Sequence, residues 1–316
     1  MIKTEKNILI ISYLFEPNNS VGAKRAGYWA KNINSLEPSI TCDVISTEPN
    51  DKVIGVNNYY CIPNPNTPKG LVKDEGVTWK KEITKWLTTS TTHYDVVIMS
   101  GSPFMYFSIG KLFQKRGTKV ILDFRDPFAL NPRFNNSGIK IRIKKYFERK
   151  FVKIADKILT VNSVCDKLTW GSTIFSTKFH IIRNGYEDQI SPIKNSIINK
   201  AEFNIIYPGK LYNDVSSTPL FNYIKKTPSI HFHHFGNSAG INSFERIYTY
   251  GIKPYDEILS AIDQSDIGLI LTSGKPFEST TKIYDYIYRK KPIWVISNEK
   301  IIDDSLSLWP SDCLFR

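Results

Sequence analysis

The second half of the chain contains a short segment, TTKIYDY, whose residue types suit a nucleotide. Ser279 or Thr280 is expected to cap a helix that begins near Thr281, which leaves backbone N–H groups for a phosphate. Lys282 and Asp285 lie three residues apart and therefore share one face of that helix. The lysine could hold phosphate and the aspartate both ribose hydroxyls, whereas on a bare helix the two would form only an ion pair. The glycine-containing loop before the helix favours the binding interpretation.

Two other segments place a glycine ahead of a cation, one directly after a predicted strand and one at the start of a predicted helix. Gly209 is followed by Lys210, and a diphosphate needs both the close backbone approach and the positive charge that this pair offers. On its own, the pair is a weak signal. Near the N-terminus, Gly22 precedes Arg25 at the start of a helix, where a phosphate could also bind. An ordinary turn with a solvated lysine–arginine pair explains that loop equally well.

Charged residues also gather after the strand predicted at Lys119–Asp123. Asp123, Arg125 and Asp126 stand at the edge of the sheet where ligands bind. They could orient a hydroxyl acceptor or stabilise a developing charge, so they are the candidate catalytic residues. The alternative is an aspartate–arginine pair that only fixes the loop.

Three histidines, His231, His233 and His234, lie in one predicted strand and suggest a metal site at first sight. His231 and His233 would share one strand face, but no cysteine or carboxylate is near them in the sequence. Histidines buried in a packed sheet are the favoured interpretation, and no metal is predicted.

The chain carries a formal net charge of +12, which predicts an anionic partner. Residues 139–154 are predicted to form one basic amphipathic helix, flanked by seven lysines and arginines. Its predicted apolar stripe consists of residues 139, 143, 146, 147, 151 and 154. That helix could rest on an anionic membrane surface. A helix packed on its own sheet with a solvated basic face is the somewhat better interpretation. Nucleic-acid binding is not predicted, because no helix-turn-helix or RNA-binding signature accompanies the charge.

Short β-branched runs alternate with helical segments, which is typical of parallel sheets with crossover helices. The predicted strands are Asn7–Ser12, Ile40–Ser46, Asp95–Ser100, Lys119–Asp123, Lys157–Asn162, His180–Arg183, Asn204–Pro208, Ile230–Gly236, Arg246–Tyr250, Asp266–Thr272 and Pro292–Ser297. A polar stretch without helical period separates two sets of strands. We therefore predict an α/β protein with domains at 1–185 and 203–316, joined by a linker at 186–202.

The first residues and the cysteines bear on the compartment. The apolar run Ile8–Ile11 is far too short for a signal core or a membrane span, so a cytoplasmic protein is expected. Its four cysteines form no C-x-x-C pair and predict neither a metal knuckle nor a disulfide framework.

The ordered set of motifs resembles the GT-B glycosyltransferases, specifically the retaining family 4 enzymes of bacterial surface-polysaccharide assembly, such as lipopolysaccharide or capsule synthesis. The resemblance covers nearly the whole chain. It rests on the loop with Gly22 and Arg25 and on the segments VILDFRDP (120–127), ADKILTVN (155–162), IRNGYE (182–187), YPGKLY (207–212), FGN (235–237) and TKIYDY (281–286).

This resemblance implies two Rossmann-like domains facing each other across a cleft, with a nucleotide diphosphate sugar held mostly by the second. Gly209 and Lys210 would contact the diphosphate, as would Thr281 and Lys282. Asp285 resembles the acid that binds the ribose.

The resemblance also assigns residues away from the diphosphate. Gly22, Arg25 and Asn184 would lie on the cleft or acceptor side. No cofactor or metal is implied, because side-chain cations and helix N-termini offset the charge of the leaving diphosphate.

The sequence departs from the family pattern in three places. Glu278, a candidate sugar contact, stands seven residues before Asp285 instead of eight. The loop at 213–217 has no second cation, and the terminal helices that usually follow the last strands are missing, which implies a shortened C-terminus.

The leading hypothesis is a retaining, metal-independent transferase that moves a sugar to a hydroxyl of a glycan or lipid-linked glycan, peripheral on the inner face of the cytoplasmic membrane. A non-catalytic nucleotide- or glycan-binding subunit and a sugar-nucleotide epimerase on the same fold are the alternatives.

Overall fold

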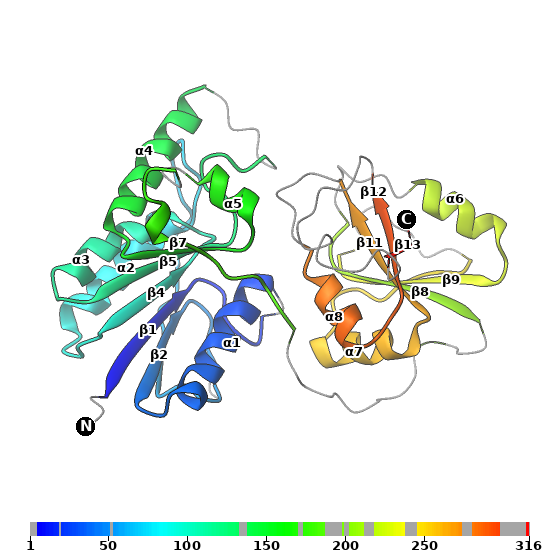
Figure 1. Cartoon of the computed structure of the whole chain (residues 1–316), viewed down its shortest axis with the longest axis horizontal. Helices are drawn as coiled ribbons and strands as arrows, with labels where there is room; N and C mark the ends of the chain where they lie inside the picture. Colours follow the sequence, from blue (N-terminus) through cyan, green and yellow to red (C-terminus); the bar gives the residue numbers. More distant parts are fainter. Residues whose placement is uncertain are drawn as a thin grey trace. The chain divides into compact units, whose positions relative to one another are not determined.

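The chain divides into two compact units, Met1–Asn184 (unit 1) and Gly185–Arg316 (unit 2). The computed structural model describes residues 5–18, 20–50, 53–132, 138–169, 173–186, 198, 202–211, 218–237, 245–273, 280–297 and 314–315. Each unit is built around its own parallel sheet (Figure 1), which confirms the predicted α/β class with two Rossmann-like sheets. Most of the predicted linker falls outside the described residues.

In its described residues, unit 1 holds a seven-stranded parallel sheet with the order β3-β2-β1-β4-β5-β6-β7. Its strands are β1 (Lys6–Ser12), β2 (Ile40–Ser46), β3 (Asn58–Cys61), β4 (Val96–Ser100), β5 (Lys119–Phe124), β6 (Lys157–Thr160) and β7 (Phe179–Ile181). The central strands are runs of isoleucine and valine because both of their faces are buried.

Helices cover both faces of this sheet. They are α1 (Val21–Leu36), α2 (Gly76–Thr89), α3 (Gly110–Gln114), α4 (Gly138–Ile154) and α5 (Ser163–Leu168), with 3₁₀ helices at Met105–Ile109 and Ser176–Lys178. On one face, α1 buries Ala26 and Ala30 against the sheet. On the other, α2 contributes Trp79 and α4 contributes Phe151 to a large aromatic core.

Unit 2 contains a six-stranded parallel sheet in its described part, with the order β10-β9-β8-β11-β12-β13. Its strands are β8 (Phe203–Pro208), β9 (Ile230–Phe235), β10 (Ile247–Thr249), β11 (Ile267–Thr272), β12 (Ile293–Ser297) and β13 (Leu314–Phe315). Helix α6 (Thr218–Lys226) packs on one face through Leu220 and Ile224. Helices α7 (Tyr255–Gln264) and α8 (Lys282–Tyr288) pack on the other through Leu259 and Ile283.

Each sheet changes direction of winding between two neighbouring strands, β1 and β4 in unit 1 and β8 and β11 in unit 2. A crevice forms at the carboxyl ends of strands at such a switch point, and ligands bind there. A buried tyrosine marks both places. The hydroxyl of Tyr106 lies 2.9 Å from the carbonyl of Ile11 and 2.7 Å from that of Ser100. The hydroxyl of Tyr286 lies 3.2 and 3.0 Å from the carbonyls of Ile206 and Leu269.

All eleven predicted strands are present, and their ends agree with the prediction to within two residues. Two strands are missing from the prediction, β3 and β13. Strand β3 is a short, largely exposed strand at the edge of its sheet, so it carries little hydrophobic signal.

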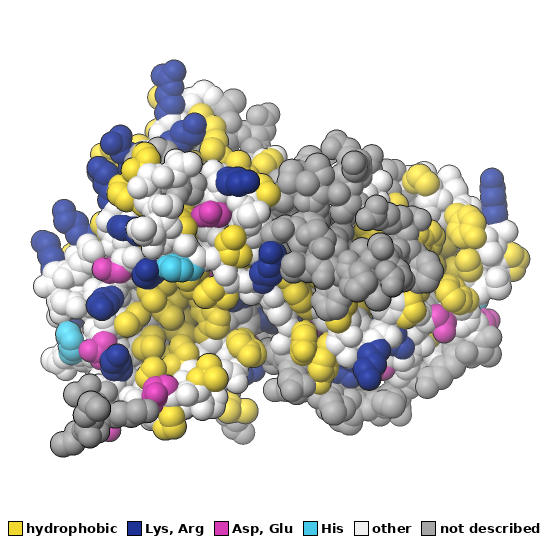
Figure 2. Space-filling view, viewed as in Figure 1, with side chains coloured by type: hydrophobic (Ala, Val, Ile, Leu, Met, Phe, Trp, Pro, Cys, Tyr) yellow, Lys and Arg dark blue, Asp and Glu magenta, His cyan; other side chains and the backbone are white. Residues whose placement is uncertain are grey.

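Helix α4 confirms the predicted basic helix but corrects its apolar stripe. Phe151 and Val152 are buried, whereas Ile139 and Tyr146 are 63% and 55% exposed. Dark-blue lysine and arginine side chains project from this part of unit 1 in Figure 2. Among the described residues no helix is long and apolar enough to cross a bilayer.

Candidate functional site

Gly209, the first residue after β8, lies at the switch point of unit 2 in a conformation that favours glycine. Its φ is +119°, and its N–H donates to the carbonyl of Phe235 at 2.6 Å. A Cβ at this position would lie 2.9 Å from Cε and 3.1 Å from Nζ of Lys282. The fold therefore brings together Gly209 and Lys282, which are 73 residues apart, in one packed contact beside the end of β8.

Tyr286 explains why α8 places Lys282 there. Its ring is fully buried and lies over Gly268 of β11, where a Cβ would come within 2.5 Å of the ring. Lys282 precedes Tyr286 by four residues and so points from the same side of the helix. The ammonium of Lys282 lies 4.8 Å from the ring centroid of Tyr207, a cation–π contact at the end of β8.

The N-terminus of α8 differs from the prediction by one position. The helix begins at Lys282 with Thr281 as its N-cap, so neither Ser279 nor Thr280 is the capping residue. The side chain of Thr281 makes no capping hydrogen bond, because this residue already has a helical φ and ψ.

Lys210 follows Gly209 directly and Asp285 lies one turn after Lys282 in α8. Asp285 accepts a short hydrogen bond from the hydroxyl of Tyr255, the first residue of α7. Lys210 is exposed, and its carbonyl accepts a hydrogen bond from Tyr207 at 3.0 Å. Glu278 lies outside the described residues, as does the loop at 213–217.

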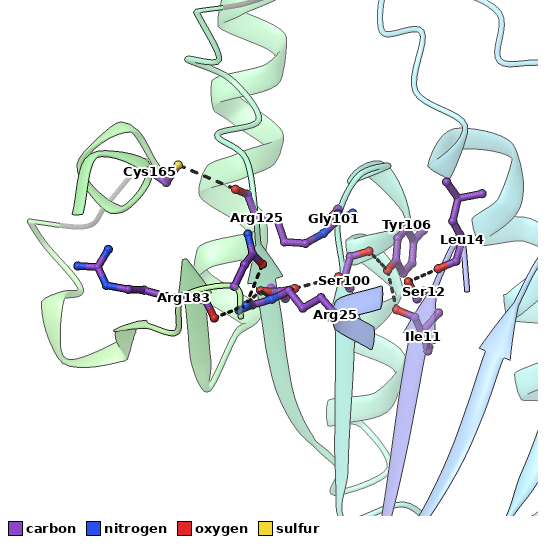
Figure 3. Close-up of polar contacts among 12 residues, drawn as sticks. Ile11, Ser12, Leu14, Arg25, Ser100, Gly101, Tyr106, Arg125, Cys165 and Arg183 are labelled. Carbon is purple, nitrogen blue, oxygen red and sulfur yellow. Dashed lines mark hydrogen bonds and ion pairs between the residues drawn. The ribbon is translucent and has the colours of Figure 1, made fainter. Parts of the chain in front are cut away.

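In unit 1, Arg25, which is labelled in Figure 3, forms a buried ion pair with Asp123. The Nε of Arg25 lies 3.2 Å from Oδ2 of Asp123, and the two side chains are 4% and 0% exposed. Ser100 donates a further hydrogen bond to Asp123 at 2.9 Å. Arg25 also donates to the carbonyl of Arg183 at 3.1 Å and to Oδ1 of Asn184 at 3.3 Å. The predicted candidates Arg25, Asp123 and Asn184 are thus in one hydrogen-bonded network.

Arg125 and Gly22 form a separate contact at the same edge of the sheet. The Nε of Arg125 donates to the carbonyl of Gly101, and its guanidinium rests on α1 where Gly22 has no side chain. A Cβ on Gly22 would lie 2.1 Å from Nη1 of Arg125, so a side chain at this position would displace the guanidinium from its present place. Burial lowers the pKa of Arg125, while the carboxylates of Asp123 and Asp126 oppose that effect. Asp126 is exposed.

Two of the three histidines of β9, which share one face of the strand, make hydrogen bonds within the sheet. His231 and His233 hydrogen-bond to Tyr248 at 3.2 Å and Tyr250 at 2.9 Å, and burial lowers the pKa of His233 to about 4. His234 points to the opposite face, where its Nε2 lies 2.8 Å from the carbonyl oxygen of Gly209. In the described part of the chain, no group of three potential metal ligands comes together.

Solved structures share this architecture at low sequence identity. Sucrose-phosphate synthase from Thermosynechococcus elongatus superposes with a TM-score of 0.64 at 10% identity, over 92% of this chain and 81% of that one. The catalytic domain of starch synthase IV from Arabidopsis thaliana, bound to ADP and acarbose, gives 0.61 at 10% identity over 92% and 83%. A UDP-N-acetylglucosamine 2-epimerase gives 0.57 at 11% identity over 94% and 80%. The chain has the GT-B fold.

No family model and no curated protein matches the sequence. The GT-B fold is common to these sugar-transferring enzymes and to the epimerase, so it does not by itself decide the reaction.

Sequence reasoning missed His234 and Tyr255, which contact Gly209 and Asp285 respectively. The sequence does distinguish His234, because side chains alternate along a strand and His234 must therefore lie on the face opposite to His231 and His233. Nothing in the sequence points to Tyr255.

Proposed function

We propose that this protein transfers a sugar from a nucleotide diphosphate sugar to a hydroxyl of a glycan or lipid-linked glycan. The observation that carries the proposal is the contact between Gly209 and Lys282 at the end of β8, where the sheet of unit 2 switches direction. A glycine packed directly against an ammonium group suits a diphosphate, which needs a backbone without a side chain and a positive charge at one place.

The proposed roles of the individual residues are those that the resemblance to the GT-B glycosyltransferases implies. Lys282 and Lys210 contact the diphosphate together with Gly209 and Thr281, and Asp285 accepts hydrogen bonds from the ribose. Glu278 remains a candidate contact of the sugar. When the glycosidic bond to the diphosphate breaks, negative charge develops on the leaving oxygen, and preplaced ammonium groups stabilise that charge. The ammonium groups would take the place of a bound metal ion in this role, and the resemblance to retaining family 4 enzymes is the basis for proposing a retaining transfer.

For the acceptor side we assign Arg125, with Gly22 keeping its guanidinium in place, and the exposed Asp126. The buried pair of Arg25 and Asp123 holds the strand end on which Arg125 stands. Both guanidinium and carboxylate groups make charge-assisted hydrogen bonds to sugar hydroxyls.

An epimerase acting on a free nucleotide sugar is the second candidate, because a UDP-N-acetylglucosamine 2-epimerase shares the fold. The two reactions differ in their need for an acceptor. Conversion of the nucleotide sugar alone, without hydrolysis or transfer, is the epimerase outcome.

The test is a screen of UDP-, GDP- and ADP-sugars by thermal shift, followed by assays of donor hydrolysis and transfer with and without EDTA. Lys282→Ala and Lys210→Ala are expected to weaken binding of the active donor about tenfold or more. Lys226→Ala is the matched control, because this lysine is exposed at the end of α6. Unchanged binding in both site variants, or binding with neither hydrolysis nor transfer, would remove the proposal.

A membrane-attached acceptor fits the surface of α4. Six of its cations are exposed, namely Lys140, Arg142, Lys145, Arg149, Lys150 and Lys153, and its single acid, Glu148, is buried. The exposed Ile139 and Tyr146 lie on the same helix. A basic face with apolar side chains among the cations suits an anionic bilayer, where each cation contributes about 1 kcal/mol. The protein would then work as a peripheral protein on the cytoplasmic side of the membrane.

A further inference from the structure

His234 contacts Gly209, the glycine of the proposed diphosphate site, and has none of the roles assigned above. Its ring is 0% exposed, and its Nε2 lies 2.8 Å from the carbonyl oxygen of Gly209. The N–H of Gly209 donates to the carbonyl of Phe235 at 2.6 Å. A Cβ on Gly236 would lie 2.4 Å from the oxygen of Gly209, so the next turn of chain is also shaped around this carbonyl. Three consecutive residues at the end of β9, His234, Phe235 and Gly236, therefore contact Gly209.

The protonation state of His234 follows from this contact. A carbonyl oxygen only accepts, so Nε2 must carry the hydrogen. Burial lowers the pKa of His234 and the nearby Lys282 also lowers it, while the hydrogen bond to the Gly209 carbonyl acts in the opposite direction. The net lowering of the pKa favours the neutral ring. Its Nδ1 then holds a lone pair, and this atom is buried without a hydrogen-bond partner among the described residues. His234 therefore acts as a donor through Nε2 alone.

The direction of the Gly209 carbonyl matters for an anion. A carbonyl oxygen carries partial negative charge, and one that faced a phosphate would repel it. The peptide between Gly209 and Lys210 is planar, so a carbonyl turned toward His234 puts the positive end of the peptide dipole on the opposite side. Glycine can rotate easily about its backbone bonds, and the hydrogen bond from His234 selects one of the two directions.

We propose that His234 is a positioning residue for the diphosphate. It holds the Gly209 carbonyl away from the ligand, so that the backbone after β8 presents its positive side next to Lys282. This inference rests on the proposed function, because it assumes that a diphosphate binds at Gly209. A purely packing role is the competing explanation, since the ring of His234 also stacks on Tyr207 with centroids 6.0 Å apart.

The experiment compares three substitutions in the full chain by isothermal titration calorimetry. UDP, GDP and ADP are each titrated into the unaltered protein, and the diphosphate that binds is then compared with its own nucleoside. His234→Phe keeps a ring but has no donor, and His234→Asn places its amide near Nδ1 instead of Nε2. His234→Gln places an amide donor near the position of Nε2 and is the rescue variant.

We expect His234→Phe and His234→Asn to weaken diphosphate binding about tenfold, the usual effect of one hydrogen bond near a charge. Binding of the nucleoside should stay within about twofold in both variants. His234→Gln should bind the diphosphate within about twofold of the unaltered protein. Thermal unfolding of each variant checks that unit 2 remains folded.

Three results would overturn the inference. In the first, His234→Phe binds the diphosphate as well as the unaltered protein does. In the second, diphosphate and nucleoside affinities fall together, which is the signature of a packing role. In the third, His234→Gln is as weak as His234→Asn. If the unaltered protein binds none of the three diphosphates, the proposed function fails first and the inference fails with it.

Discussion

Replacing Asp123 by asparagine separates a structural role of this residue from a chemical one. Asp123 is fully buried and receives hydrogen bonds from Ser100 and from both Nε and Nη2 of Arg25. The amide has nearly the same shape but no charge, so the substitution leaves the Arg25 guanidinium buried without its counter-ion. Removal of one partner from a buried ion pair costs about 3–5 kcal/mol.

The lower end of that range is expected here. The amide oxygen of the asparagine can still accept one hydrogen bond, and Arg25 keeps its bonds to the carbonyl of Arg183 and to Asn184. We therefore expect a loss of about 3 kcal/mol from the free energy of unfolding of unit 1, a large part of the ~5–15 kcal/mol typical of a folded domain.

Urea unfolding, followed by tryptophan fluorescence and circular dichroism, measures this loss. Asp126→Asn is the control, because this exposed aspartate stands three residues later, just after β5, and should cost less than about 0.5 kcal/mol. A loss below about 1 kcal/mol for Asp123→Asn would refute the buried ion pair. If unfolding is unchanged but transfer is abolished, Asp123 takes part in the chemistry and the structural assignment is wrong.

Three further predictions concern other parts of the molecule. Gly209→Ala should weaken diphosphate binding about tenfold or more in calorimetry, because its Cβ would lie 2.9 Å from Cε of Lys282 at a φ of +119°. Lys150→Glu combined with Lys153→Glu should reduce cosedimentation with vesicles containing phosphatidylglycerol at low salt, while phosphatidylcholine vesicles bind neither protein. The pKa of His233 falls from 6.5 to about 4 on folding, so its contribution to stability is complete above pH 6.5 and is lost as the pH falls toward 4. Unfolding between those pH values should reveal a loss of about 3 kcal/mol that is absent from His233→Gln, and parallel curves for the two proteins would contradict this prediction.

The strands could be predicted because each sheet buries both faces of its central strands, which leaves unbroken runs such as Ile8–Ile11. Their sequence along the chain also predicts which residues follow a strand and so stand at the carboxyl edge. The positions of Gly209 and Asp123 at the carboxyl ends of their strands were predicted in this way.

The sequence could not predict which side chains contact each other at the carboxyl edge of each sheet. Arg25 and Asp123 are 98 residues apart, and Gly209 and Lys282 are 73 residues apart, so their contacts depend on strand order and helix rotation. The rotation of α8 is set by the fit of Tyr286 over Gly268, a steric contact without any sequence pattern. The N-cap of α8 was misplaced by one residue for a related reason, since serine and threonine at neighbouring positions give the same local signal.

The buried tyrosines link the two strands on either side of each switch point. The hydroxyl of Tyr106 lies within hydrogen-bonding distance of carbonyls from β1 and β4, and that of Tyr286 of carbonyls from β8 and β11. The strand ends at each switch point are therefore ordered before any ligand binds. The conformational entropy lost on binding then comes from the side chains and loops beyond the strand ends. A mutation that removes either tyrosine hydroxyl would add the entropy cost of ordering the strand ends themselves.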